Sequence, residues 1–446
     1  WWGHQIPAWY CEDCQAVNVP KPERYLEDPT SCEACGSPRL KRDEDVFDTW
    51  FSSALWPLST LGWPEETEDL KAFYPGDVLV TGYDILFLWV SRMEVSGYHF
   101  MGERPFKTVL LHGLVLDEKG QKMSKSKGNV IDPLEMVERY GADALRFALT
   151  YLATGGQDIR LDLRWLEMAR NFANKLYNAA RFVLLSREGF QAKEDTPTLA
   201  DRFMRSRLSQ GVEEITALYE ALDLAQAARE VYELVWSEFC DWYLEAAKPA
   251  LKAGNAHTLR TLEEVLAVLL KLLHPMMPFL TSELYQALTG KEELALEAWP
   301  EPGGRDEEAE RAFEALKQAV TAVRALKAEA GLPPAQEVRV YLEGETAPVG
   351  ENLEVFRFLA RADLLPERPA KALVKAMPRV TARMPLEGLL DVEEWRRRQE
   401  KRLKELLALA ERSQRKLASP GFREKAPKEV VEAEEDHQKK VLAVAV

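Results

Sequence analysis

Two lysines and two serines lie within five consecutive residues, Lys122-Met123-Ser124-Lys125-Ser126. The ammonium groups of Lys122 and Lys125 can neutralise the charge that develops on a pyrophosphate leaving group. Ser124, Ser126 and the amides of the loop can donate hydrogen bonds to the pyrophosphate oxygens. This chemistry is typical of nucleotidyl transfer. Because an isolated pair of lysines is more often a solvated loop, the flanking segments must decide between these two interpretations.

The segments beside this lysine loop, residues 122–126, predict the elements that would hold it in place. Residues 112–116 predict a short strand, and residues 117–120 predict a polar turn. Residues 128–133, Gly-Asn-Val-Ile-Asp-Pro, indicate a break before a helix. We therefore predict that a strand leads into the lysine loop and that a helix follows it.

Four cysteines form two pairs with two residues between the members of each pair. The pairs Cys11 with Cys14 and Cys32 with Cys35 are separated by 17 residues. This spacing is typical of a closed structural zinc site with four thiolate ligands, and it predicts a zinc knuckle over residues 11–35. Two disulfides are the alternative, which the lack of other secretory features disfavours.

Length and composition predict several packed domains. The chain has 446 residues, of which 46% are hydrophobic. The longest apolar stretches, such as residues 265–273, are too short to span a bilayer, so we expect a cytoplasmic protein with no membrane partner. The net charge of −15 argues against indiscriminate binding to nucleic acid, although local charge can differ from the total.

The pattern along the chain predicts four domains of different class. We expect an α/β catalytic domain with a parallel sheet over residues 1–151, an all-α bundle over 152–300, a small α+β domain over 301–384 and an antiparallel coiled coil over 385–446. The strongest periodic segments predict helices at residues 84–96, 163–185 and 307–330 and strands at residues 338–342 and 380–384.

The predicted coiled coil carries an excess of positive charge. Residues 393–428 contain 12 Lys or Arg and 6 Asp or Glu residues. A cluster of cations in this segment favours contact with an RNA backbone. A coiled coil that serves as an oligomerisation or spacer element is the alternative. The cluster comprises Arg396, Arg397, Arg398, Lys401 and Arg402.

One stripe of the predicted helix at 163–185 combines cations, amides and an aromatic ring. Such a face suits unpaired bases, which proteins recognise by stacking and by hydrogen bonds to base edges. We therefore predict contact with an anticodon, and a solvated polar face is the alternative. The stripe consists of Arg164, Asn171, Lys175, Asn178 and Phe182.

Two tryptophans lie close to polar, turn-prone segments. Trp50 and Trp89 could form two walls of a small apolar pocket, while Asp84 could accept hydrogen bonds from ribose hydroxyls. Gly82 would allow a ligand to approach the backbone closely. The alternative is that both indoles belong to the hydrophobic core.

The run from His112 to Pro133 resembles the second signature of the class I aminoacyl-tRNA synthetases. Further segments, residues 1–11, 48–64, 81–93 and 141–146, look like the valyl branch of class Ia of that family. The resemblance implies that residues 1–151 are the second half of a Rossmann-type catalytic fold. It also implies that Lys125 contacts the phosphates of ATP, that Gly82 and Asp84 hold the ribose, and that His112 and Gly113 border the adenine. By the same resemblance, Trp50 and Trp89 line the amino-acid pocket.

The resemblance implies ATP-dependent attachment of L-valine to the valine tRNA isoacceptors through a valyl-adenylate, with Mg²⁺ assisting and Zn²⁺ structural. A His-x-Gly-His type motif and an editing domain, both expected in this family, do not occur in the sequence. We therefore expect the remaining N-terminal half of the enzyme as a partner, and we expect this chain alone neither to activate valine nor to edit threonine. Isoleucyl specificity is one alternative, and a non-catalytic tRNA-binding zinc protein derived from a synthetase is another.

Overall fold

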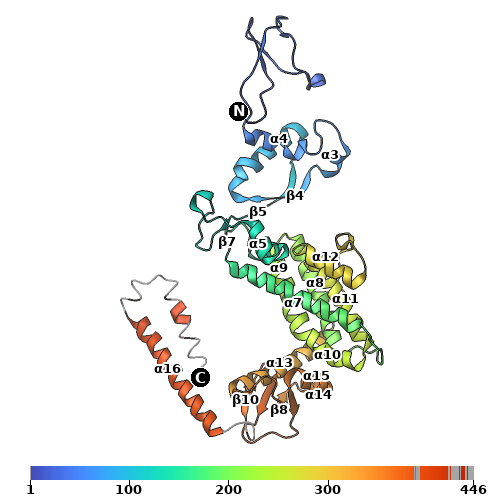
Figure 1. Cartoon of the computed structure of the whole chain (residues 1–446), viewed down its shortest axis with the longest axis vertical. Coiled ribbons are helices and arrows are strands. Elements are labelled where there is room, and N and C mark those ends of the chain that lie inside the picture. The colour runs from blue at the N-terminus through green and yellow to red at the C-terminus, as the bar shows by residue number, and fades with distance from the viewer. Residues whose placement is uncertain are drawn as a thin grey trace. The chain divides into compact units, whose positions relative to one another are not determined.

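The computed structural model describes residues 2–385, 387, 392–419, 422, 431, 433–436 and 439. The elements follow one another along the chain as Figure 1 shows. The chain forms two compact units, the first made of residues 1–181, 211–236 and 267–301 and the second of residues 182–210, 237–266 and 302–446. Among the described residues, no helix is both long and apolar enough to cross a membrane.

The first unit opens with a three-stranded antiparallel sheet that carries the cysteine pairs. Its strands are β1 (Trp9–Cys11), β2 (Val17–Asn18) and β3 (Leu40–Arg42), in the order β2-β1-β3. The short helices α1 (Thr49–Ala54) and α2 (Trp56–Ser59) follow it. Asp48 begins α1, because its carboxylate accepts the amide of Trp50 at 3.0 Å.

Two parallel strands form the centre of the α/β part of the first unit. The strands β4 (Gly76–Gly82) and β5 (Phe106–His112) pair in parallel, with Gly82 opposite His112 at their carboxyl ends. The helices α3 (Glu68–Phe73) and α4 (Ser91–Met101) lie beside them (Figure 1). The buried side chains that hold this arrangement are Leu79, Val90, Met93 and Phe106. The predicted parallel sheet is confirmed.

The helix predicted at residues 84–96 is only partly right. A 3₁₀ turn at Tyr83–Ile85 leads into a π-helix at Leu86–Val90, and α4 begins at Ser91. A side chain from α4 bonds to this π turn, because Arg92 Nη1 donates to the carbonyls of Phe87 and Leu88 at 3.1 and 2.9 Å.

The single strand predicted at residues 112–116 is wrong. β5 ends at His112, and β6 (Val115–Leu116) pairs instead with β7 (Ile159–Arg160). The break has a steric cause at Gly113. A Cβ atom there would lie 1.9 Å from the carbonyl oxygen of Gln157, so the backbone of residue 157 crosses the chain at this position.

A series of helices follows β6 and β7. The helices α5 (Pro133–Tyr140) and α6 (Ala142–Leu152) come first. The predicted helix at 163–185 is confirmed as α7 (Leu163–Arg187), and breaks separate the later helices at residues 188–198 and 274–277. The later helices are α8 (Leu199–Glu220), α9 (Leu224–Glu233), the π-helix η5 (Leu234–Tyr243), α10 (Leu244–Ala253), α11 (Ala256–Leu273) and α12 (Pro278–Thr289).

The second unit contains a small mixed sheet covered by helices (Figure 1). The predicted helix at 307–330 is confirmed as α13 (Glu307–Ala330), followed by α14 (Ala347–Glu351) and α15 (Leu353–Ala360). The predicted strands are confirmed as β8 (Val338–Gly344) and β11 (Val380–Met384). The edge strands β9 (Ala362–Leu364) and β10 (Leu373–Ala376) were missed, because both are short and lack a regular apolar alternation.

The terminal segment begins with the long helix α16 (Val392–Ala418). Near its end, Lys416 Nζ donates to Glu434 Oε2 at 2.6 Å, and Ser413 Oγ also donates to Glu434. The chain therefore returns to α16, as a hairpin requires. Most of the predicted second helix lies outside the described residues.

Asp306 links the start of α13 to α8. Its carboxylate accepts the amide of Ala309 at 2.9 Å and receives Nε and Nη2 of Arg202 at 2.8 and 3.2 Å. The hydrogen bonds from Arg202 are the largest cause that holds the pKa of Asp306 below its usual value, and the Ala309 amide acts in the same direction. A carboxylate with a lowered pKa in the folded state stabilises the fold above its unfolded pKa.

We predict that Asp306→Ala lowers the free energy of unfolding by about 1–2 kcal/mol at neutral pH, since it removes a helix cap and an ion pair. The difference from the unmodified chain should shrink as the pH falls through the folded-state pKa, because the carboxylate is then protonated in both states. Urea unfolding followed by circular dichroism measures the free energy of unfolding of both chains at each pH. Glu351→Gln, at an exposed carboxylate, is the control, and a difference that does not change with pH would contradict the assignment.

Candidate functional site

The four paired cysteines converge on one point. Their Sγ atoms all lie within 4.8 Å of one another. Cys11 Sγ lies 3.6 Å from Cys35 Sγ, and Cys14 Sγ lies 3.5 Å from Cys32 Sγ. Four thiolates around Zn²⁺ at about 2.3 Å would be about 3.8 Å apart, so the cluster fits the ion. The cysteines are free, and the separations exceed the bond length of about 2.05 Å that the disulfide alternative requires.

Local backbone geometry shapes this cluster. Gln15 has φ of 64° and Gly36 has φ of 72°, so each cysteine pair turns back through a left-handed residue. Asn18 Nδ2 lies 3.7 Å from Cys32 Sγ. Burial acts to raise the pKa of the Cys32 thiol, but hydrogen bonds from the amides of Cys35 and Ala34 lower it to about 6.

The structure brings together the residues expected around a nucleoside. Gly82 and His112 occupy opposite positions at the carboxyl ends of β4 and β5. A Cβ atom at Gly82 would lie 2.6 Å from Asp84 Oδ1, so the Asp84 carboxylate lies against the Gly82 backbone. His112 and Gly113 line a cavity of about 840 Å³. Carboxyl ends of parallel strands are the usual position for ligands in such sheets.

Asp158 organises this edge, and its place in the site was not predicted. Its Oδ1 accepts the amide of Leu114 at 2.9 Å and the hydroxyl of Tyr83 at 3.1 Å. It therefore ties the residue after β4 to the turn after β5. A sequence separation of 44 residues from Leu114 leaves no local pattern that could identify the contact.

Of the two tryptophans expected in the amino-acid pocket, Trp89 has the better defined surroundings. Its indole N–H donates to the carbonyl of Ser53 at 3.0 Å, and its ring lies 5.7 Å from that of Trp56. It also packs against the core of β4 and β5. Trp50, in α1, is half-buried. One face of Trp89 therefore belongs to the core, as the alternative interpretation expected.

The lysine loop leaves β6 through a hydrogen-bonded turn. Leu116 pairs with Lys122 in an isolated antiparallel bridge, and Lys125 begins a 3₁₀ turn, η4 (Lys125–Lys127). The Ser124 and Ser126 hydroxyls lie 3.2 Å apart. The predicted helix after the loop is confirmed as α5, which Asp132 caps by accepting the Leu134 amide at 2.8 Å. The side chain of Lys125 lies outside the described part of the structure.

The predicted base-contacting residues all lie on α7, with different degrees of exposure. Arg164 is 86% exposed at its side chain and pairs with Asp162 at 2.5 Å. Asn171 and Asn178 are exposed as predicted. Lys175 is half-buried, with Nζ 3.7 Å from the ring centroid of Trp236. That cation–π contact fixes the Lys175 ammonium over an aromatic face, which the sequence stripe did not indicate.

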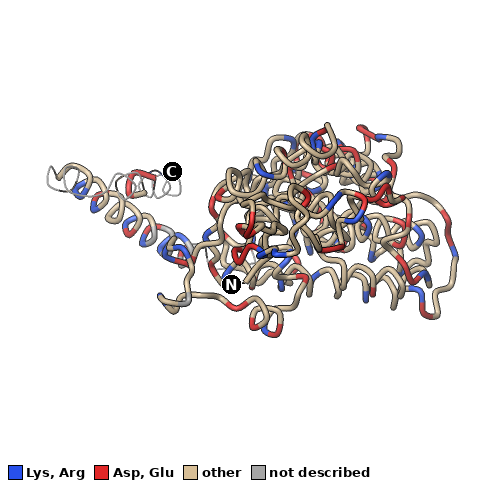
Figure 2. Tube along the Cα trace, turned by 90° about the horizontal axis from the view of Figure 1, so that it is seen from above, with Lys and Arg blue, Asp and Glu red and all other residues tan. Residues whose placement is uncertain are grey.

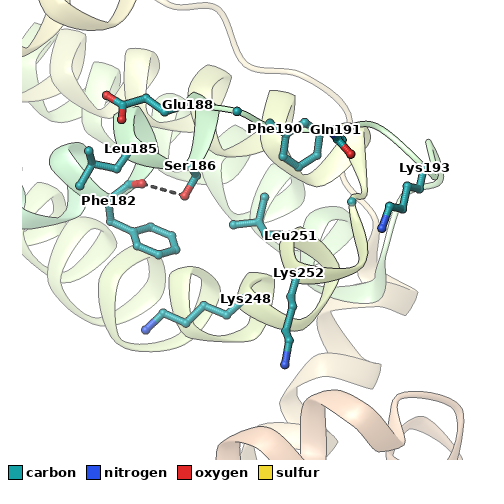
Figure 3. Close-up of a pocket in the computed structure, with 12 residues that line it drawn as sticks. Phe182, Leu185, Ser186, Glu188, Phe190, Gln191, Lys193, Lys248, Leu251 and Lys252 are labelled. Atoms are coloured by element: carbon teal, nitrogen blue, oxygen red, sulfur yellow. Dashed lines mark hydrogen bonds between the residues drawn. The ribbon is translucent and has the colours of Figure 1, made fainter.

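Phe182, at the end of α7, borders a cavity of about 520 Å³ in the second unit (Figure 3). Lys248 Nζ lies 5.5 Å from the centroid of the Phe182 ring. Figure 3 shows a second ring, Phe190, and a second lysine, Lys252, at the same cavity. Aromatic rings bordered by cations suit stacking of a base together with binding of its phosphate. The sequence stripe identified Phe182 but not its neighbours, which come from other segments.

The basic cluster near the end of the chain lies on α16. Arg396, Arg397 and Lys401 are exposed, whereas the side chains of Arg398 and Arg402 lie outside the described part. Arg396 Nε bonds to Glu400 Oε1 at 3.2 Å. Figure 2 shows Lys and Arg residues interspersed with Asp and Glu along the helix. Single exposed pairs of this kind contribute little stability, so the cations stay accessible to a polyanion.

Three regions of the chain match family models. Residues 1–162 match tRNA synthetases class I (I, L, M and V), and residues 201–342 match the anticodon-binding domain of tRNA ligase. Residues 391–445 match the valyl tRNA synthetase tRNA binding arm.

Curated relatives and a solved structure are similar to the chain. The valine–tRNA ligase of Thermus thermophilus is 97% identical over 445 residues, which cover 100% of this chain and 52% of the relative. That of Deinococcus radiodurans is 48% identical, covering 97% of this chain and 51% of the relative. The chain thus spans about half the length of these relatives. LeuRS of Agrobacterium radiobacter, solved in a ternary complex with tRNA and LeuAMS, shares the fold with a TM-score of 0.56 and 23% identity, over 69% of this chain and 41% of that chain.

Proposed function

Because the chain belongs to the class I tRNA synthetases, we propose that it forms part of an enzyme that attaches L-valine to its tRNA through a valyl-adenylate, with ATP as the second substrate. The observation that carries this proposal is the 97% identity over the whole chain to the valine–tRNA ligase of Thermus thermophilus. The match of the terminal arm to a valyl tRNA synthetase model favours valine over isoleucine. We further propose that the rest of the enzyme, about half of the relative's length, completes the catalytic fold.

The carboxyl ends of β4 and β5 are proposed to hold the nucleoside of ATP. Asp84 would accept hydrogen bonds from the ribose hydroxyls, with Gly82 allowing close approach, and His112 and Gly113 would border the adenine. Their convergence at one edge supports this assignment. The lysine loop would contact the phosphates, with Lys122, Lys125 and the two hydroxyls stabilising charge on the pyrophosphate as it leaves. When bound, Mg²⁺ would neutralise part of the same phosphate charge.

We propose that Trp50 and the exposed face of Trp89 contact the valine side chain. The indole N–H of Trp89 is already bonded to Ser53. Only its apolar ring is therefore left to face a substrate, which suits an aliphatic amino acid. A pocket of this kind separates isosteric amino acids weakly, a limit for which the aminoacyl-tRNA synthetases, the valyl enzyme included, are the well-known example.

We predict that Lys125→Ala, made in the complete enzyme, lowers valine-dependent ATP–pyrophosphate exchange by about a hundredfold, because an ammonium that stabilises transition-state charge is lost. Binding of tRNA should change little. Exchange with isoleucine in place of valine tests the isoleucyl alternative. A complete enzyme with no amino-acid-dependent exchange at all would favour the non-catalytic tRNA-binding protein, and equal rates for the Lys125 variant would remove that residue from the site.

The cysteine cluster is proposed to bind one structural Zn²⁺. The thiol separations fit tetrahedral coordination, and four protein ligands leave no position for a catalytic water. The ion would join the turn after β1 to the turn before β3 and so hold the small sheet together.

We predict one zinc per chain by atomic absorption. Cys32→Ser should lower that content and the Tm of the knuckle, since metal binding and folding are coupled in such sites. Cys240→Ser is the matched control, because Cys240 is a buried cysteine of the second unit that lies outside the cluster and should leave the zinc content unchanged. Retention of zinc by the Cys32 variant would exclude that thiol as a ligand.

We propose that two of the four domains expected from the sequence bind tRNA. These are the helical bundle over residues 152–300 and the terminal arm over residues 385–446. Matches to an anticodon-binding domain and to a tRNA binding arm support this proposal. Phe182 would stack on an unpaired base, while the exposed cations of α16 would contact the phosphate backbone. Arg164, Asn171, Lys175 and Asn178 would approach the same RNA from α7.

We predict that Lys175→Ala and Phe182→Ala each raise the KM for tRNA in the complete enzyme by about tenfold, since a stacked base or a cation contact is lost. Valine activation, measured by pyrophosphate exchange, should stay unchanged. Lys291→Ala removes an exposed cation that pairs with Glu297 and is the control. Unchanged tRNA kinetics in both variants would contradict the assignment.

A further inference from the structure

Asp117 and Asn129 join the two ends of the lysine loop. Asp117 follows β6, and its Oδ1 accepts the amides of Lys119 and Gln121 at 3.0 and 2.7 Å. Its Oδ2 accepts Nδ2 of Asn129 at 2.9 Å. Asn129 Oδ1 in turn accepts the amide of Ser124 at 2.9 Å. Two side chains thus connect the strand end, the turn, the centre of the loop and the segment before α5.

The orientation of the Asn129 amide is fixed by charge. A carboxylate can only accept hydrogen bonds, so Asp117 must face the NH₂ group of Asn129. The carbonyl oxygen of Asn129 is then left to face the Ser124 amide. The hydrogen bond from Asn129, the largest cause, and the amide of Gln121 lower the pKa of Asp117. Asp117 is therefore ionised near neutral pH, and the orientation of Asn129 is kept.

These contacts restrict what each group can do in catalysis. Both oxygens of Asp117 already accept hydrogen bonds, which disfavours a role as a general base. The Ser124 amide is bonded to Asn129. The Ser124 amide is thus engaged within the loop, and the expectation that the loop amides donate to phosphate oxygens stays a prediction. The Ser124 hydroxyl, by contrast, contacts a side chain of the same loop, because it lies 3.2 Å from the Ser126 hydroxyl.

We propose that Asp117 and Asn129 are positioning residues for the adenylate-forming step. They hold the lysine loop at a fixed position relative to the end of β6. This inference rests on the proposed function. Neither residue contacts substrate in this role. They act through Ser124, because ordering the loop before ATP binds removes part of the entropy loss from the chemical step.

The two residues allow a test by exchange of their side chains. In Asp117→Asn alone, an NH₂ group must face either Asn129 Nδ2 or the amides of Lys119 and Gln121, so one side of the clamp is lost. In Asn129→Asp alone, two carboxylates oppose each other. In the double variant Asp117→Asn/Asn129→Asp, the amide at 117 donates to the carboxylate at 129. That carboxylate also accepts the Ser124 amide, so the hydrogen bonds that join residue 117, residue 129 and Ser124 are restored in kind. The long contact of Asn129 Nδ2 with the Lys122 carbonyl, at 3.4 Å, is the one that the double variant loses.

The expected result in the complete enzyme is a fall of about tenfold in kcat for valine-dependent pyrophosphate exchange in each single variant. The KM for valine and the Tm should stay unchanged. The double variant should recover most of the lost rate, which independent structural damage at two sites would not do. Glu118→Gln, one residue from Asp117 and exposed, is the control and should match the unmodified enzyme.

A second measurement does not depend on activity. Trypsin should cleave between residues 119 and 127 several times faster in the single variants than in the unmodified chain, and the double variant should be protected again. Unchanged exchange and unchanged cleavage in the single variants would overturn the proposal, as would a double variant as slow as the worse single variant. If the unmodified complete enzyme shows no valine-dependent exchange, the proposed function fails, and cleavage alone decides whether the pair holds the loop.

Discussion

The parallel pairing of β4 with β5 is the contact on which the candidate site depends. Its register sets Gly82 opposite His112, so the carboxyl ends of both strands meet at one edge. The π-helix at Leu86–Val90 and α4 make the connection between the two strands, and the buried side chains of Val90 and Met93 pack this connection onto the sheet. Because a one-residue slip would turn every side chain of a strand to the other face, the small core fixes the chemistry of the edge as well as its stability.

The chain beyond this edge is held by polar contacts more than by packing. Gly113 lets the backbone of residue 157 cross the end of β5, and Asp158 bonds to both turns that leave the strands. Asp117 then organises the next turn and, through Asn129, the lysine loop. Carboxylates therefore act here as acceptors for backbone and amide N–H groups. This leaves the lysines as the charged groups suited to polyphosphate.

Periodicity predicted the regular elements well and their interruptions poorly. The helix at α13 and the strand at β11 begin and end where the apolar pattern predicted. The π turn before α4 was missed, and the hydrogen bonds from Arg92 to two of its carbonyls are side-chain contacts that periodicity does not register. The single strand predicted at residues 112–116 is interrupted at Gly113, since the crossing at Gln157 comes from a segment far away in sequence.

The sequence by itself determined the composition of each site: four cysteines at metal spacing, a loop with two lysines and two hydroxyls, and a basic terminal segment. These signals are local, because the two members of each cysteine pair, and the cations of each segment, lie within a few residues of one another. Only the tertiary structure decided which side chains support them. Asp158 and the Lys175–Trp236 contact join segments 44 or more residues apart, and the sharing of Asn129 between Asp117 and Ser124 depends on how the loop closes. Such pairings follow from chain packing, which one-dimensional spacing does not contain.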